Sequence, residues 1–312
     1  MALDRWQAAR AMTALAAVMM TLACSSADSP SPSSGAPPSM PSSGTGTVEI
    51  GGRQVTVNVP ASYQPGRPAP LVIALHGYTS NAKDLERYLR LTPESERRGF
   101  VYAYPDGSTD ARGDHFWNAT DACCAFYNPK PDDSRYLSEL ISAMQGAYRI
   151  DRTRVYLIGH SNGGFMAFRM ACDHADQVTA VVSINGASWN DTARCRPSGP
   201  VSVLAIHSST DETVAFNGGV IDGAAYPSAA TTVAQWLGHN RCADAGRDAP
   251  ALDLVTDLAA AETSVRTYAR GCANGSTVQA WTINGGSHAP SLGPAFAPAV
   301  TDFLLSQTKL AR

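Results

Sequence analysis

Hydrophobic positions along most of the chain fall into short apolar runs that alternate with amphipathic stretches. Valines alternate with polar residues after a Gly51-Gly52 turn, which predicts a hairpin over 47–60. Near-continuous apolar runs, typical of buried strands, follow at 71–75, 100–104, 154–158, 178–184 and 201–206. Helix-like stretches separate them, at 78–98, 132–148, 161–172 and 231–237. A second hairpin, 263–269 with 277–283, and a helix over 294–306 complete the pattern.

This alternation predicts an α/β fold with a mostly parallel central sheet and helices on both faces. After residue 46 the chain shows no repeat and no second low-complexity break, so we expect one domain over 47–312. Ligand sites of such sheets lie beyond the carboxyl ends of the strands. The turns that follow the predicted strands are therefore where functional residues are expected.

The first part of the chain has a different composition from the rest. Two arginines precede an apolar run that ends at residue 23 and is too short to span a bilayer as a helix. We therefore expect a secretory signal peptide over 1–23. Residues 24–46 are mostly Ser, Pro, Gly and Thr with almost nothing to bury, which predicts a disordered tether before the domain.

The signal peptide ends in a sequence that resembles a bacterial lipobox. In Thr21-Leu22-Ala23-Cys24 the signal would be cut before a cysteine that receives lipid, although Thr21 stands where such boxes usually carry Leu. The alternative is ordinary cleavage after Ala27, which leaves no anchor. A lone cysteine between an apolar run and a tether favours lipidation of Cys24. Both alternatives predict an exported protein, and membrane contact only through that anchor.

Six further cysteines lie in the predicted domain: Cys123, Cys124, Cys172, Cys195, Cys242 and Cys272. An even number in an exported chain predicts disulfides. Cys172 ends a predicted helix and Cys195 follows the next strand, so these two can meet. Cys242 follows a helix and Cys272 sits at the tip of the second hairpin, which makes a second pair. Cys123 and Cys124 are left either to bridge each other or to remain thiols.

Charge and composition exclude some classes of partner. The formal net charge is -3, 16% of residues are charged, and Lys and Arg form no run, so we expect no nucleic-acid partner. The cysteines form no Cys-x-x-Cys or Cys-x-x-His pair, so their spacing predicts no metal site. We expect a monomer without a cofactor.

Gly159-His160-Ser161-Asn162-Gly163 matches Gly-x-Ser-x-Gly, the pattern of a nucleophile elbow. The pattern alone is weak, but here it directly follows a predicted strand and opens an apolar helix. The serine of such a turn must adopt a strained conformation, and flanking glycines remove side chains that would collide with the strand and helix. An ordinary helix-capping serine does not need glycine on both sides, so Ser161 is the candidate nucleophile.

A serine hydroxyl needs a base to take its proton and an acid to hold that base. In proteins with a nucleophile elbow of this kind, the three catalytic residues occur along the chain in the order Ser, then Asp or Glu, then His. Of the histidines after Ser161, only His288 follows a plausible acid and lies in a flexible turn after the last strand. Asp211 follows the strand over 201–206 and is the candidate acid, with Glu212 as the near alternative.

Backbone N–H groups are expected to stabilise the oxyanion that forms when the serine attacks a carbonyl. One is expected from Asn162, the residue after the nucleophile, and the other from Tyr78 in the turn after 71–75. Tyr78 and Trp189 are also the candidate substrate-binding aromatics, with a core position as the alternative for Trp189. His76, at a strand end, is expected to be structural.

Several short motifs become specific when they are taken together. They are His76-Gly77, Tyr104-Pro105-Asp106-Gly107, Trp117-Asn118 followed by Cys123-Cys124, Asp132-Asp133, Arg154 through Gly164, and Gly285-Gly286-Ser287-His288. Together they resemble the family of secreted polyhydroxybutyrate depolymerase and feruloyl esterase-type serine hydrolases. The resemblance implies an α/β-hydrolase fold, metal-free ester hydrolysis through an acyl-enzyme, and the roles assigned above to Ser161, Asp211 and His288.

The chain departs from that family at two places near the site. His288-Ala289-Pro290 lacks a tryptophan that often follows the histidine, and Asn118-Ala119-Thr120-Asp121 replaces a glycine-rich stretch. Polyester, hydroxycinnamoyl, aromatic and acetyl esters all stay open as substrates. An acyltransferase with the same three residues, a peptidase and a non-catalytic surface binding module are the alternative classes, although a binding module typically loses one of the three.

Overall fold

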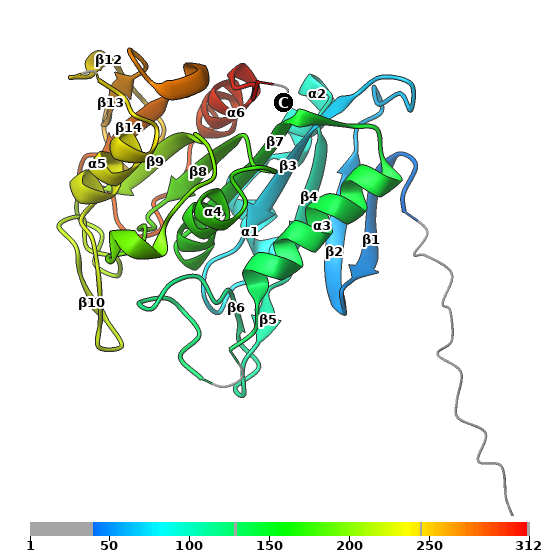
Figure 1. Cartoon of the computed structure of the whole chain (residues 1–312), viewed down its shortest axis with the longest axis horizontal. Helices are drawn as coiled ribbons and strands as arrows, with labels where there is room; N and C mark the ends of the chain where they lie inside the picture. The colour runs from blue at the N-terminus through cyan, green and yellow to red at the C-terminus, as the bar shows by residue number, and fades with distance from the viewer. Residues whose placement is uncertain (1–39, 128–129, 244, 311–312) are drawn as a thin grey trace, which may run out of the picture. The chain divides into compact units, whose positions relative to one another are not determined.

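A ten-stranded sheet runs through the described part of the chain, which in this computed structural model comprises residues 40–127, 130–243 and 245–310 (Figure 1). In sheet order the strands are β1 (Gly44–Ile50), β2 (Arg53–Val59), β4 (Val101–Pro105), β3 (Ala69–Leu75), β7 (Ile150–His160), β8 (Ala180–Ile184), β9 (Ser202–Ser208), β14 (Val278–Ile283), β13 (Thr263–Tyr268) and β12 (Arg247–Leu252). From β4 to β14 neighbours are parallel, and both edges of the sheet are antiparallel. The predicted mostly parallel sheet is confirmed.

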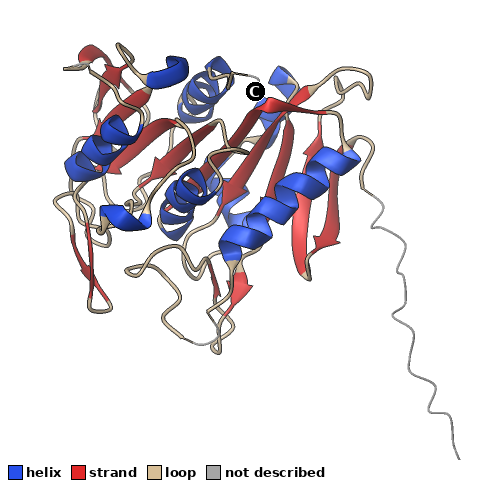
Figure 2. Cartoon of the chain, viewed as in Figure 1, coloured by secondary structure: helices blue, strands red, loops and turns tan. Residues whose placement is uncertain are grey.

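Helices cover both faces of this sheet (Figure 2). One face carries α3 (Asp133–Ala147), α4 (Asn162–Asp173) and α5 (Ala229–His239), and the other carries α1 (Ala82–Leu89), α2 (Thr92–Arg98) and α6 (Phe296–Ser306). Strand β3 shows why its sequence is a continuous apolar run. Leu71 and Ile73 pack into the core under α3 and α4, whereas Val72 and Ala74 pack into the core with α1 and α6. A strand buried on both faces has no polar side to display.

The long helix-like stretch predicted over 78–98 is two short helices. Helix α1 ends at Leu89 and is capped by Arg90, whose φ of 55° is left-handed; α2 begins at Thr92 with a proline in its first turn. The Glu86 carboxylate accepts hydrogen bonds from the N–H groups of Leu91 and Thr92, at 3.3 and 2.9 Å. These bonds satisfy donors at the break between the helices, a tertiary detail that hydrophobic periodicity does not report.

The elements that the sequence pattern did not predict are short or exposed. They are the pair β5 (Ser108–Thr109) and β6 (His115–Phe116), the pair β10 (Gly219–Ile221) and β11 (Ala224–Tyr226), the edge strand β12, and two short 3-10 helices, Thr192–Arg194 and Ala273–Gly275. Residues of β12 are almost all exposed and include Pro250. An edge strand with solvent on both faces needs no apolar alternation, so it has no pattern to detect.

The folded domain begins earlier than the predicted boundary at 47. Strand β1 starts at Gly44, which pairs with Val59 of β2. Before it, Met40 packs against the core, and the Tyr148 hydroxyl donates a 2.8 Å hydrogen bond to the carbonyl oxygen of Pro41. Strand pairing uses backbone groups, so a Gly- and Thr-rich sequence can join an edge without burying side chains.

The predicted signal peptide, its candidate lipidation site Cys24 and most of the predicted tether lie outside the described residues. Within the described ranges, no helix has both the length and the apolar character needed to cross a bilayer.

Three disulfides join the cysteines of the domain. Cys172 at the end of α4 is bonded to Cys195, Cys242 to Cys272, and Cys123 to its neighbour Cys124. The first two are the pairs predicted from the sequence. For Cys123 and Cys124 the structure shows the vicinal bond rather than two thiols.

We expect loss of the Cys172–Cys195 bond to destabilise the domain. The bond closes a sequence separation of 23 residues, and restricting the unfolded chain in this way contributes about 2 to 4 kcal/mol. Urea unfolding of the Cys172→Ala/Cys195→Ala double variant, followed by far-UV circular dichroism, should show that decrease in the free energy of unfolding. A double variant as stable as the wild type would contradict the prediction.

Candidate active site

Ser161 lies on a sharp turn between β7 and α4. Its φ of 55° and ψ of -120° fall in a region that residues with a side chain rarely adopt. Glycines make the turn possible: a Cβ at Gly159 would lie 2.1 Å from the carbonyl oxygen of Gly163, and one at Gly163 would lie 1.9 Å from that of Leu75. The strand, the turn and the helix are arranged as the Gly-x-Ser-x-Gly pattern predicts.

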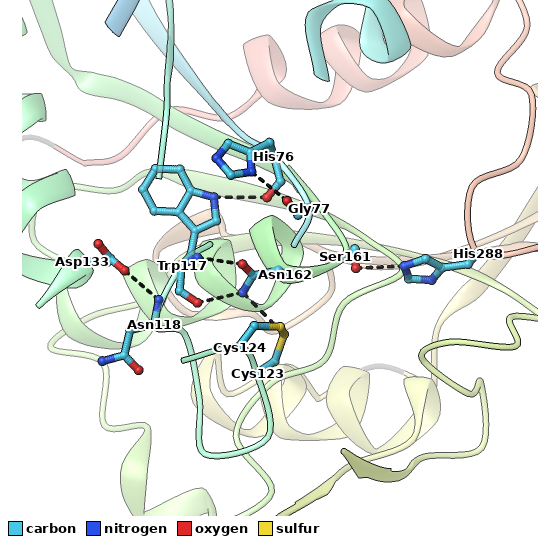
Figure 3. The surroundings of a disulfide bond; sticks show 10 residues. All are labelled: His76, Gly77, Trp117, Asn118, Cys123, Cys124, Asp133, Ser161, Asn162 and His288. Carbon is cyan, nitrogen blue, oxygen red and sulfur yellow. Dashed lines mark hydrogen bonds between the residues drawn. A yellow bond between two sulfur atoms is a disulfide. The ribbon is translucent and has the colours of Figure 1, made fainter. Parts of the chain in front are cut away.

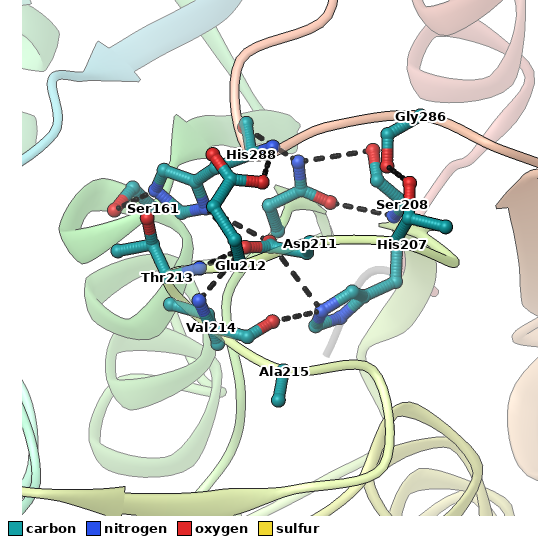
Figure 4. Close-up of polar contacts among 12 residues, drawn as sticks. Ser161, His207, Ser208, Asp211, Glu212, Thr213, Val214, Ala215, Gly286 and His288 are labelled. Atoms are coloured by element: carbon teal, nitrogen blue, oxygen red, sulfur yellow. Dashed lines mark hydrogen bonds and ion pairs between the residues drawn. The ribbon is translucent and has the colours of Figure 1, made fainter.

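The turn holds the Ser161 hydroxyl against the ring of His288 (Figure 4). Ser161 Oγ and His288 Nε2 are 2.8 Å apart, and the other ring nitrogen, Nδ1, lies 2.8 and 2.9 Å from the two carboxylate oxygens of Asp211. A carboxylate only accepts hydrogen bonds, so Nδ1 donates and Nε2 is left to accept from the serine. The structure thus brings together the three side chains that the sequence singled out.

The environment keeps Asp211 ionised. Burial by itself raises the pKa of Asp211, but the hydrogen bond from His288 and those from the N–H groups of Val214 and Thr213 outweigh it and lower the pKa below its usual value. Both N–H groups lie 2.8 Å from the same carboxylate oxygen. The chain around this aspartate therefore stabilises a negative charge directly behind the imidazole.

Glu212, the alternative acid, has a different partner. Its carboxylate accepts a 3.2 Å hydrogen bond from the backbone N–H of His288 and is not bonded to the ring (Figure 4). His207 lies behind Asp211, 3.7 Å from its carboxylate, and its Nε2 donates to the carbonyl oxygen of Val214 at 2.8 Å. Burial lowers the pKa of His207, so this second histidine braces the Asp211 loop as a neutral group.

Asn162 is the first residue of α4, where a backbone N–H has no acceptor within the helix. Its side chain is used elsewhere: Oδ1 accepts from the N–H of Trp117 at 2.7 Å, and Nδ2 donates to the Trp117 carbonyl oxygen at 2.8 Å (Figure 3). Nδ2 also lies 3.4 Å from Cys123 Sγ, so the vicinal disulfide borders the same contact. The side chain thus ties the 117–124 loop to the helix start.

His76 supports the same region from beneath. It is completely buried; its Nδ1 donates to the carbonyl oxygen of Gly77 at 2.7 Å, and its Nε2 accepts from the N–H of Gly107 at 2.9 Å. The Trp117 indole N–H donates to the carbonyl oxygen of His76 at 3.1 Å. Burial lowers the pKa of His76 to about 4, so the ring is neutral at ordinary pH. These backbone contacts match the structural position expected for this histidine.

A cavity of about 260 Å³ opens above the serine and is lined by Tyr78, Leu85, Tyr88, His160, Ser161 and His288, among others. The Tyr78 hydroxyl donates to Asp110 at 3.2 Å, and its ring packs edge-on against Phe126. Tyr88 comes from α1, and no motif in the sequence points to it. The described residues contain no group of three or more His, Cys, Asp or Glu side chains that could hold a metal ion.

The structure does not bring Trp189 to this cavity. Its side chain is 6% exposed and belongs to the core that α4 and α5 share. The Arg194 guanidinium lies 4.4 Å from the ring centroid, and Gln235 donates to the Trp189 carbonyl oxygen at 3.0 Å. The chain after β8 buries this tryptophan in the core, and Trp189 is not among the residues that line the cavity beside Ser161. The structure thus shows the core position, the alternative expected for Trp189. The tyrosine rings that line the cavity beside Ser161 are those of Tyr78 and Tyr88.

Comparison with known proteins finds a family model and several curated relatives that match this chain. The sequence model of a protein family described as "Esterase PHB depolymerase" matches residues 59–263. Feruloyl esterase D of Neurospora crassa is 25% identical over 295 residues, which cover 90% of each chain. Feruloyl esterase B of Piromyces equi is 26% identical over 250 residues, 77% of this chain and 43% of the relative. In three of the curated relatives, the matching part of this chain spans less than half of the relative's length.

Solved structures show the same fold. An acetyl xylan esterase from Aspergillus awamori superposes with a TM-score of 0.59 and 17% sequence identity, covering 81% of this chain and 93% of that one. The Est1E protein of Butyrivibrio proteoclasticus covers 85% of this chain and 98% of its own, with a TM-score of 0.51 and 12% identity. The α/β-hydrolase fold expected from the motifs is thereby confirmed.

The turn at Ser161 should not tolerate a side chain at Gly163. We expect Gly163→Ala to lower the melting temperature strongly, because its Cβ would meet the Leu75 carbonyl oxygen at 1.9 Å and force α4 away from β3. Gly146→Ala is the matched control, since Gly146 lies in α3 with nothing within 4 Å of an added Cβ, and alanine favours a helix over glycine. Calorimetry that found the two variants equally stable would rule out the close contact.

Proposed function

Because the chain belongs to the Esterase PHB depolymerase family, we propose that it is a carboxylic-ester hydrolase that works through an acyl-enzyme on Ser161. The observation that carries the proposal is the hydrogen-bonded series from Ser161 Oγ to His288 Nε2, 2.8 Å, and from His288 Nδ1 to Asp211, also 2.8 Å. A nucleophile bonded to a base that is oriented by an acid is the arrangement that activates a serine hydroxyl. Ser161 and His288 also line a cavity of about 260 Å³, which offers room for part of a substrate.

In the first half of the reaction, Ser161 Oγ attacks the ester carbonyl carbon while His288 Nε2 takes the hydroxyl proton. The N–H groups of Asn162 and Tyr78 are the proposed donors to the oxyanion that forms. His288 then gives the proton to the leaving alcohol oxygen as the bond between the carbonyl carbon and that oxygen breaks. The acyl group is left on Ser161, and Asp211 stabilises the imidazolium that exists between the two proton transfers.

In the second half, a water molecule takes the place of the alcohol. His288 Nε2 removes one water proton as the oxygen attacks the acyl carbon, and returns a proton to Ser161 Oγ as the acid product leaves. Neutral imidazole is the starting form of both halves. The ionised Asp211 holds the ring in the required tautomer, because its carboxylate can only accept from Nδ1.

We propose polyester or hydroxycinnamoyl esters as substrates. The family description names PHB depolymerase-type esterases, and several relatives, among them the two described above, are named feruloyl esterases. In this chain the rings of Tyr78 and Tyr88 and the side chain of Leu85 line the cavity beside Ser161. Flat or apolar acyl groups suit such walls, because aromatic rings bury large area with specific geometry.

We also propose that the protein is exported. Its three disulfides support this, since such bonds persist in oxidising compartments. The signal peptide predicted over 1–23 supplies the route, and attachment of lipid at Cys24 stays a prediction that lies outside the described residues.

Ser161→Ala tests the proposed reaction directly. We expect kcat for p-nitrophenyl acetate and methyl ferulate, and the rate of release from a polyhydroxybutyrate film, to fall below about 1% of wild type, since no acyl-enzyme can form. Ser142→Ala, an exposed serine on α3, is the control and should keep full activity. A Ser161→Ala protein that retained substantial turnover would exclude this serine as the nucleophile.

The two neighbouring acids should differ in effect. Asp211→Asn should lower kcat about 10²- to 10⁴-fold, because an amide no longer stabilises the imidazolium or fixes its tautomer. Glu212→Gln should stay within a few-fold of wild type, because the glutamine amide oxygen can still accept from the His288 N–H. Steady-state kinetics on p-nitrophenyl acetate measure both. An inactive Glu212→Gln variant together with an active Asp211→Asn variant would assign the acid to Glu212 instead of Asp211.

A further inference from the structure

The backbone of His288, like its ring, is fixed by hydrogen bonds to other parts of the chain. The chain reaches this residue from β14 through a glycine turn, and its carbonyl oxygen accepts two side-chain hydrogen bonds. His160 Nε2 donates at 2.8 Å and Asn185 Nδ2 donates at 2.6 Å. His160 is the last residue of β7, and Asn185 directly follows β8. Two side chains from separate strand ends therefore converge on one oxygen atom of the histidine loop.

His160 is suited to this contact because it is neutral. Burial lowers the pKa of His160 to about 4, so near neutral pH one ring nitrogen carries the proton that the carbonyl oxygen needs and the other carries none. Its ring packs between those of Tyr88 and His288, with each centroid 5.1 Å away. An uncharged neighbour does not oppose the positive charge that His288 acquires during the reaction.

Asn185 connects the same loop to β9. It is completely buried, its φ is 52°, and its Oδ1 accepts from the N–H of Ser208 at 2.7 Å. Its Nδ2 lies 3.2 Å from Ser208 Oγ and 3.3 Å from the carbonyl oxygen of Ser287, in addition to the 2.6 Å contact with His288. One amide thus fixes the spacing between the end of β9, which leads to Asp211, and the loop that carries His288.

We propose that His160 and Asn185 are positioning residues that clamp the His288 carbonyl and thereby set the reach of its imidazole to Ser161. The inference rests on the proposed function, in which His288 is the base. Fixing the carbonyl fixes the peptide plane next to the His288 Cα, and hence the direction in which the side chain leaves the backbone. An error of about 1 Å in the position of a catalytic group can cost about 10²-fold in rate. The clamp acts on the reaction through the position of the His288 ring, and His160 also lines the cavity beside Ser161.

Kinetics of four variants test the clamp, with p-nitrophenyl acetate as substrate. His160→Leu removes one donor and should lower kcat about 10- to 100-fold while KM changes less than about 3-fold. His160→Gln should recover most of the loss, because its amide nitrogen can reach the position of imidazole Nε2. Asn185→Gly removes the other donor yet tolerates the positive φ, and should resemble His160→Leu. Because both donors hold one oxygen, the double variant should lose less than the product of the single losses.

Several outcomes would overturn the clamp: a wild-type kcat in His160→Leu or Asn185→Gly, a glutamine variant as slow as the leucine variant, or single losses that multiply. Melting temperatures are measured for each protein. If His160→Leu does not fold, Asn185→Gly decides alone.

His239→Leu, which removes a half-buried histidine of α5, is the control and should keep wild-type kcat. Ser161→Ala is assayed alongside: activity there would refute the proposed function itself, whereas an inactive Ser161→Ala with fully active clamp variants would refute only the clamp.

Discussion

The close approach of α4 to β3 and β7 is the contact on which the rest of the site depends. Gly159 and Gly163 have no side chains, so the helix can begin almost against the backbone of the strands. That approach forces Ser161 into its left-handed turn and lifts its hydroxyl above the sheet. A strained residue of this kind persists only where the surrounding structure determines it completely. The packing of α4 on both strands supplies that constraint.

The same approach explains why so many buried polar groups surround the turn. A helix start leaves N–H groups without intrahelical partners, and the 117–124 loop lies beside it. Asn162 pairs with both backbone groups of Trp117, and Trp117 in turn bonds to His76. Because each of these groups is satisfied, the network can be buried without the cost of an unpaired donor. It fixes the position of the Asn162 backbone, where the proposed oxyanion donor lies.

Much of this arrangement was predictable because it depends on local sequence. The apolar runs report strands buried on both faces, and Gly-x-Ser-x-Gly after such a run reports the turn at Ser161. The order of chemical groups along the chain then left His288 and Asp211 as partners. The choice between Asp211 and Glu212 was not decidable, since it depends on how one turn presents two adjacent carboxylates. The structure places one on the ring and the other on the backbone of His288.

The residues that the sequence misplaced or did not reveal depend on tertiary packing. Trp189 follows a strand end, as a substrate-binding residue often does, yet its side chain is buried in the core. Tyr88 lies on a polar helix and still lines the cavity, because α1 covers the sheet face beside the Ser161 turn. Strand β12 was not predicted because almost all of its residues are exposed, so its sequence shows no alternation of apolar and polar positions.

In the proposed function, the reacting groups and much of the cavity wall come from different parts of the fold, and the Tyr88 ring is one contact between them. Ser161, Asp211 and His288 follow strand ends, whereas Leu85 and Tyr88 come from α1, so the cavity can change shape without displacing the reacting groups. The connection is the Tyr88 ring, which packs 5.1 Å from His160, the residue that bonds to the His288 carbonyl. Leu85 belongs both to the cavity wall and to the core beneath α1. A change at Tyr88 alters the wall and also the packing of the side chain that holds the base in place.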